Sequence, residues 1–136
     1  MKYFVIGFFA IGIGLLAWKT MMPASEAIAE NIVDPVFSAQ ATSGLETYDK
    51  NCRSCHGIKG SGSENGPPLI HDIYNPGHHS DGAFYAAAKN GSKQHHWQFG
   101  DMPPQSHLTN TEIANIVRYI RELQEANGIF YKQHQM

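Results

Sequence analysis

The sequence predicts an all-α domain of short helices and long loops, with a hydrophobic helix added at the N-terminus. The clearest element is an apolar stripe at helical spacing near the C-terminus, formed by Ile113, Ile116, Val117, Ile120 and Leu123. No segment shows the alternation typical of a strand. Thirteen glycines and seven prolines indicate a loop-rich chain, in which a cofactor would supply much of the core.

The C-terminal helix has both a start signal and a stop signal. Thr109 and Glu112 form a capping box, in which each side chain accepts a hydrogen bond from a backbone N–H of the other residue. Asn127-Gly128 follows the apolar stripe and is typical of a helix end. The helix is therefore expected between these two signals.

Two shorter helices are expected earlier in the chain. The first runs from about Gly44 to Cys52 through Leu45 and Tyr48. The second follows the cap at Ser80-Asp81 and ends at Asn90-Gly91. Long loops, rich in glycine and proline, are expected over 57–75 and 95–107.

The chain is expected to divide into four parts. Residues 23–40 are polar with small side chains and predict a linker, and 41–126 form the domain. A short tail follows at 127–136. The first part, 1–22, predicts a signal peptide or a transmembrane anchor.

The N-terminal part starts with Lys2 and continues with sixteen uncharged, mostly apolar residues, 3–18. As a helix this run is about 24 Å long, against a hydrocarbon core of about 30 Å. Extension to Met22 closes the gap, because Lys19 can snorkel. A small-x-small pattern at 27–29 lies far from the apolar run for a cleavage site, which favours an anchor. In either case the domain is expected on the periplasmic side, membrane-anchored or soluble after cleavage.

The charge balance argues against two classes of partner. The formal net charge is −2, and without Lys2 and Lys19 the chain has 8 basic against 12 acidic side chains. Such a balance does not suit nucleic acid or an anionic membrane surface.

Both cysteines lie in one motif, Cys52-Arg53-Ser54-Cys55-His56. Two thiols at this spacing on one helical turn can each add to a vinyl group of a haem, and the histidine can then ligate the iron. A thioredoxin-type redox pair, a disulfide or half of a zinc site would use the same spacing. A redox pair would be expected near a βαβ pattern, which is not visible. The motif therefore favours covalent attachment of one haem.

A second iron ligand is expected from Met102. It lies in the second long loop and is followed by Pro103-Pro104, which stiffen the backbone. Long loops are uncommon in a compact domain unless they have a function, and here they would wrap a flat cofactor. A core-filling role is less suited to Met102, because the other methionines lie near the chain ends.

Five features of a known family appear in order: Gly44 with Tyr48, the motif Cys52 to His56, Gly66-Pro67-Pro68-Leu69, Met102-Pro103, and Ile116 with Tyr119. With these features the segment from about Gly44 to Leu123 resembles the small bacterial class I cytochromes c, which carry one haem. The resemblance implies a class I cytochrome c fold.

The resemblance also implies a role for each site residue. Cys52 and Cys55 would form thioethers to haem c, and His56 and Met102 would be the axial ligands of the iron. The carbonyl of Pro67 would accept the proton of the His56 ring and fix its angle, and Leu69 would line the haem pocket. Gly44 would let the first and last helices approach closely.

Seven further histidines depart from the plainest family pattern. His95-His96 precede Trp97 and Phe99, which we expect to pack on the haem edge. We favour surface or propionate hydrogen bonding for these histidines. An alternative axial ligand, and a copper site using His78/His79 and His95/His96, are the other interpretations.

The function expected from the sequence is one-electron transfer, without catalysis at the iron, because both axial positions are filled. The partners would be redox proteins, a donor reductase and an acceptor oxidase or dehydrogenase. Lysines are scarce, so docking is expected to rest on apolar contact around the haem edge. The alternatives are a haem-based sensor of gas or small ligands and a redox subunit of a larger oxidase or dehydrogenase complex.

Overall fold

The computed structural model describes residues 11, 13 and 28–133 of the 136-residue chain. Within these residues the chain forms helices joined by loops and no strands, as the sequence predicts. The elements are α3 (Ala39–Asn51), α4 (Arg53–His56), η1 (Ile58–Gly60), η2 (Asp72–Tyr74), α5 (Asp81–Asn90) and α6 (Asn110–Ala126). The predicted N-terminal segment 1–22 lies outside the described residues, apart from two positions. Among the helices described, none has the length and apolar character to cross a bilayer.

Helix α6 has the bounds that its signals predict. The Thr109 hydroxyl accepts from the Glu112 backbone N–H, and the Glu112 carboxylate accepts from the Thr109 N–H, which completes the capping box. The helix ends at Ala126, and Gly128 follows with φ +78°. Helix α5 likewise begins after Ser80, whose side chain accepts from Ala83 N–H.

Helix α3 begins earlier than the sequence suggested. It starts at Ala39 and not near Gly44, because the Ser38 side chain caps the first turn by accepting from the Ala41 N–H. The last two positions of the predicted linker are therefore helical. The two short 3-10 turns, η1 and η2, lie in the long loop and were not predicted.

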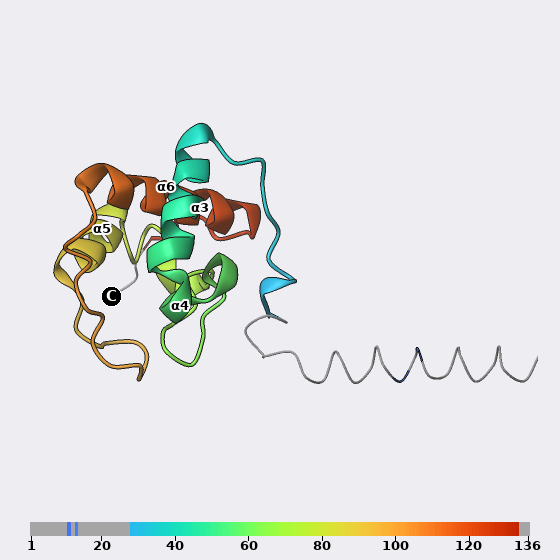
Figure 1. Ribbon diagram of the computed structural model, residues 1–136, viewed down its shortest axis with the longest axis horizontal. Coiled ribbons are helices and arrows are strands. Elements are labelled where there is room, and N and C mark those ends of the chain that lie inside the picture. The colour runs from blue at the N-terminus through green and yellow to red at the C-terminus, as the bar shows by residue number, and fades with distance from the viewer. Residues whose placement is uncertain (1–10, 12, 14–27, 134–136) are drawn as a thin grey trace, which may run out of the picture.

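The core lies where α3 crosses α6 (Figure 1). At the crossing, a Cβ on Gly44 would lie 1.9 Å from the backbone oxygen of Asn115, so only glycine permits this approach. Tyr48 of α3 and Tyr119 of α6 are buried there, with ring centroids 5.3 Å apart. The remaining core residues come mainly from the predicted apolar stripe of α6.

Both flanking segments pack against the domain. In 28–37, Ala29 and Ile32 are buried, and Val33 makes two backbone hydrogen bonds of 2.9 Å with the side-chain amide of Asn127. After α6, Ile129 is buried and Lys132 pairs with a carboxylate of the long loop. The described parts of the predicted linker and tail thus lie on the surface of the domain.

Candidate functional site

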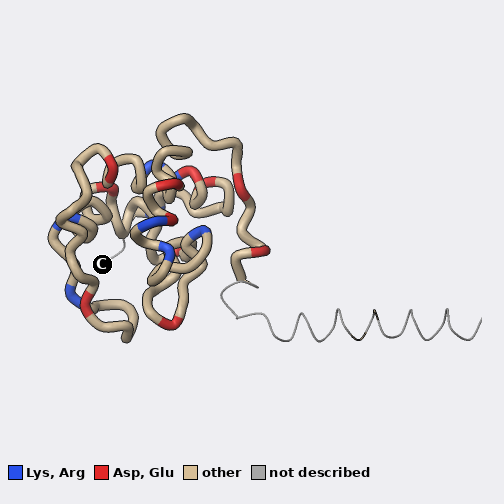
Figure 2. The backbone as a smooth tube through the Cα atoms, in the orientation of Figure 1, with Lys and Arg blue, Asp and Glu red and all other residues tan. Residues whose placement is uncertain are grey.

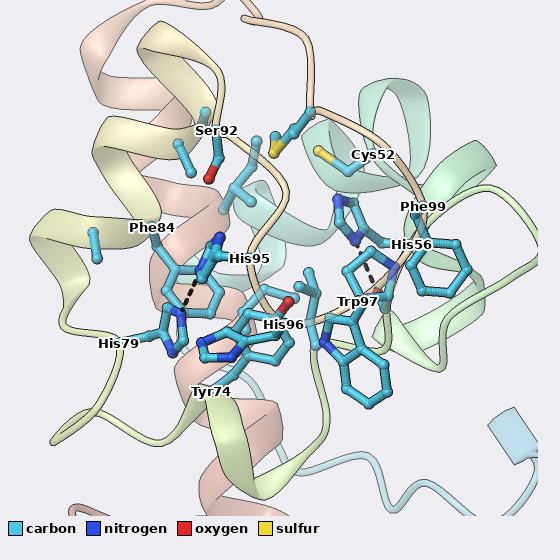
Figure 3. A pocket seen from close by; sticks show the side chains of 18 of the residues that line it. Cys52, His56, Tyr74, His79, Phe84, Ser92, His95, His96, Trp97 and Phe99 are labelled. Carbon is cyan, nitrogen blue, oxygen red and sulfur yellow. Dashed lines mark hydrogen bonds between the residues drawn. The ribbon is translucent and has the colours of Figure 1, made fainter. Parts of the chain in front are cut away.

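A cavity of about 260 Å³ lies between α3, α5, α6 and the loop 92–102 (Figure 3). Its walls are largely apolar. The lining includes seven of the eight site residues that the sequence predicts, namely Cys52, His56, Pro67, Leu69, Trp97, Phe99 and Met102. The eighth, Cys55, is exposed and does not line the cavity.

The cysteine motif forms one helical turn. The backbone N–H groups of Cys55 and His56 both donate to the Cys52 carbonyl, at 3.1 and 2.8 Å. Cys52 joins α3 to α4, and its N–H donates to the Tyr48 carbonyl. The two thiols and the imidazole thus project from one turn whose backbone is fixed at both ends.

The structure does not favour the other uses of two cysteines. Neither thiol is in a disulfide, and among the described residues neither belongs to a group of three or more side chains that could hold a metal ion. Burial, and then the neighbouring Cys55, raise the pKa of Cys52 to about 11. A redox-active pair needs a thiolate near neutral pH, so this environment does not suit it.

The His56 ring is oriented by a backbone carbonyl. Its Nδ1 lies 3.0 Å from the Pro67 oxygen, which can only accept, so Nδ1 carries the proton. Burial lowers the pKa of His56, while the hydrogen bond to Pro67 acts in the opposite direction. The ring is therefore neutral, and its Nε2 keeps a lone pair, which is the state that ligates a metal.

Met102 is held by a backbone pair at the base of its loop. Ser92 and Met102 exchange two N–H···O bonds, of 3.0 and 2.9 Å. Gly91 precedes this pair with φ +79°, and a Cβ there would lie 2.6 Å from the Met102 oxygen. Two prolines follow, so the chain fixes the Met102 backbone from both sides.

Trp97 brings an unsatisfied donor to the cavity. Its Nε1 is buried and makes no hydrogen bond, and its ring meets His71 edge-on at 5.2 Å. Burial raises the pKa of Tyr74, and the nearby Trp97 indole lowers it in part, but no hydrogen bond of normal geometry joins the two. A buried N–H without a partner indicates a missing acceptor.

Three more residues, Tyr74, His79 and Phe84, line the cavity. Of these, the sequence indicates a site role only for His79, one of the additional histidines. They are held by Arg121, a buried side chain of α6 that donates to the carbonyls of Tyr74 and His79 and to Asp81, and lies over the Phe84 ring at 4.6 Å. The only hint of Arg121 in the sequence is that position 121 borders the apolar stripe.

Charge is balanced across the surface. Figure 2 shows Lys and Arg interspersed with Asp and Glu along the chain. Eight of the ten Lys and Arg residues lie in the described part, and six form ion pairs, namely Arg53, Lys59, Lys93, Arg118, Arg121 and Lys132. Within the described part of the chain, no segment presents a run of unpaired basic side chains.

The comparison with known families decides the identity. The family model described as Cytochrome c matches residues 41–124, more than half of the chain. The chain belongs to the cytochrome c family. No curated protein and no solved structure matches it. The helical domain without strands agrees with the class I fold predicted for this cytochrome.

Membership of the family implies a covalently bound haem c, and the cavity of the cytochrome fits this group. Its walls are apolar, as the faces of the macrocycle require. A neutral imidazole and a thioether line the same space, and the Trp97 N–H is available to an acidic substituent at the haem edge. The family likewise establishes haem-based electron transfer as the general activity.

Proposed function

We propose that this cytochrome is a one-electron carrier, with haem c joined to Cys52 and Cys55 and its iron ligated by His56 and Met102. The observation that supports this best is that His56 and Met102, 46 positions apart, line one cavity. When bound, the haem iron supplies the one-electron couple.

The protein tunes this couple through its own side chains. The Pro67 carbonyl accepts from Nδ1 of His56, fixes the ring and makes Nε2 a better donor. A neutral thioether from Met102 favours the reduced state, so this ligand pair raises the reduction potential. With His56 and Met102 as its two ligands from the chain, the iron would offer no site to a substrate, and we expect no enzymatic reaction there.

Electron exchange would use the edge near Cys55 and Phe99, which are exposed. The basic side chains are mostly paired with carboxylates, so a lysine ring does not guide docking. We propose redox protein partners, a donor reductase and an acceptor oxidase or dehydrogenase, that dock through small, largely apolar contacts.

The location is also a proposal. The apolar run 3–18 supports export, and a thiol pair destined for haem attachment belongs where haem is added outside the cytoplasm. The domain would then work on the periplasmic side, either anchored by the N-terminal helix or released.

Spectroscopy of the haem-loaded protein tests the ligand assignment. The ferric parent should show the red Met-to-iron charge-transfer band, and Met102→Ala should abolish it. The matched controls are His95→Ala and His96→Ala, which should keep the band. Absence of the band in the parent, with a spectrum typical of two imidazole ligands, would transfer the sixth position to a histidine.

Carbon monoxide tests the carrier function against a sensor function. The reduced parent should not bind CO rapidly, because Met102 occupies the sixth position. Met102→Ala should bind it, since that position is then open. Rapid binding by the parent would contradict the carrier assignment.

A further inference from the structure

Four histidines gather beside the cavity from two separate loops. His78 and His79 precede α5, while His95 and His96 lie in the loop that carries Met102. Figure 3 shows His79, His95 and His96 near one another. Nε2 of His78 lies 3.2 Å from Nε2 of His96, and Nε2 of His79 lies 3.4 Å from Nε2 of His95. The two histidines of one loop therefore need not bind one ion by themselves, because each lies next to a histidine of the other loop.

The tautomers of two of these rings follow from their backbone partners. Nδ1 of His79 lies 2.8 Å from the Ile73 carbonyl, and Nδ1 of His95 lies 2.7 Å from the Lys93 carbonyl. Because a carbonyl only accepts, both protons are on Nδ1. In the neutral rings the two Nε2 lone pairs then face each other at 3.4 Å, and a positive charge between them is required for attraction.

A metal ion fits the spacing. Two nitrogens bound tetrahedrally to Zn²⁺ at about 2.0–2.1 Å lie about 3.3–3.4 Å apart. The separations of the two Nε2 pairs in the structure are 3.2 and 3.4 Å. Donor atoms of His78, His79 and His96 all lie within 4.8 Å of one another.

The surroundings have the features of a built metal site. The carbonyls of Ile73 and Lys93 fix two ring orientations, as the outer partners of metal-bound histidines do. Arg121, itself buried, donates to the His79 carbonyl and so holds the backbone of one ligand. The cluster is thus arranged without the need for an ion to assemble it.

We propose that His78, His79 and His96, whose donor atoms lie within 4.8 Å of one another, form a binding site for a divalent late transition-metal ion. His95, beside His79, is a further donor, and the two nitrogen separations of 3.2 and 3.4 Å favour Zn²⁺. The site is separate from His56 and Met102 and goes beyond electron transfer. An ion there would join the loop of Met102 to the loop before α5.

Calorimetric titration of the haem-loaded, chelator-treated full chain with Zn²⁺ tests the proposal. One ion should bind per chain. His78→Ala and His96→Ala should each weaken binding at least about 10-fold, the lower end of what loss of even an outer partner costs. His107→Ala is the matched control, since His107 bonds Asn51 outside the cluster, and it should bind like the parent.

X-ray absorption at the zinc edge should show four light-atom ligands at about 2.0–2.1 Å. The visible spectrum verifies that each variant keeps its haem site. If His78→Ala loses its haem site, the test uses His96→Ala instead, because the His96 ring is exposed. Absence of Zn²⁺ binding, binding unaffected by both variants, or binding of Cu²⁺ alone would overturn the assignment. The visible spectra that test Met102 as an iron ligand do not depend on whether Zn²⁺ binds.

Discussion

Arg121 shows how a single side chain organises the site from outside it. Its side chain is 7% exposed, and its guanidinium donates to Asp81, Gln124 and two loop carbonyls. Those carbonyls belong to Tyr74 and His79, which both line the cavity. The loop before α5 is therefore held by α6 through one residue.

Replacing Arg121 with alanine should lower the free energy of unfolding by about 3 kcal/mol or more, because buried carbonyls lose their donor. Denaturant unfolding of the haem-loaded protein measures this. The control is Arg118→Ala on the same helix, whose side chain is 50% exposed in an ion pair with Glu122. It should cost at most about 1 kcal/mol, and equal costs for the two variants would contradict the role given to Arg121.

The sequence predicts residues whose chemistry is local and misses those whose role depends on distant partners. His56 and Met102 could be named because their motifs are short, and both line the cavity. Arg121 and Tyr74 could not, since their partners lie in other elements. The histidine pairs were visible, but their meeting depends on how two loops fold together.

At the scale of elements, the crossing of α3 and α6 depends on the absence of one side chain. A Cβ on Gly44 would meet the backbone oxygen of Asn115 at 1.9 Å, and backbone cannot rotate away. The helices would have to separate, and with them the buried pair Tyr48 and Tyr119.

Gly44→Ala should therefore destabilise the protein by about 3 kcal/mol or more, at the upper end of overpacking costs. Gly82→Ala in α5 is the matched control, because its Cβ would meet only the Ser80 hydroxyl, at 3.7 Å. Alanine is the better helix former, so the control should be neutral or stabilising by up to about 1 kcal/mol. Thermal unfolding followed by circular dichroism measures the stability of both variants. A neutral Gly44→Ala would show that α3 and α6 do not need to approach so closely.

Element boundaries could be predicted where both caps are visible. Helix α6 has a capping box and a glycine after its end, and it keeps those bounds. Helix α3 begins at Ala39, five residues before Gly44. The sequence did not reveal this start, because a single serine cap within a polar stretch looks like part of a linker. The turns η1 and η2 depend on loop contacts that no local pattern reveals.

At the scale of the whole molecule, two kinds of core stabilise the fold. One is polypeptide alone, between α3 and α6. The other is the cavity, whose walls from α5 and the loop 92–102 face the haem position. The first should survive without the cofactor, and the second should not.

Removal of the haem tests this division. A Cys52→Ala/Cys55→Ala variant purified without haem should lose protection from amide hydrogen exchange first in α5 and 92–102, because their apolar side chains would face water. Amides of α3 and α6 that lie in their contact should retain more protection. Uniform loss along the chain would show instead that the two cores form together.

The hydrogen bonds between Val33 and Asn127 would limit how far the domain could lie from an N-terminal membrane anchor. They fix the incoming chain to the end of α6, so an uncleaved anchor at 1–22 would be joined to a domain that already begins near residue 28. Six peptide units then separate membrane from protein, at most about 20 Å of chain. A carrier with so short a tether would exchange electrons with neighbours at the bilayer surface, and it would travel by lateral diffusion in two dimensions.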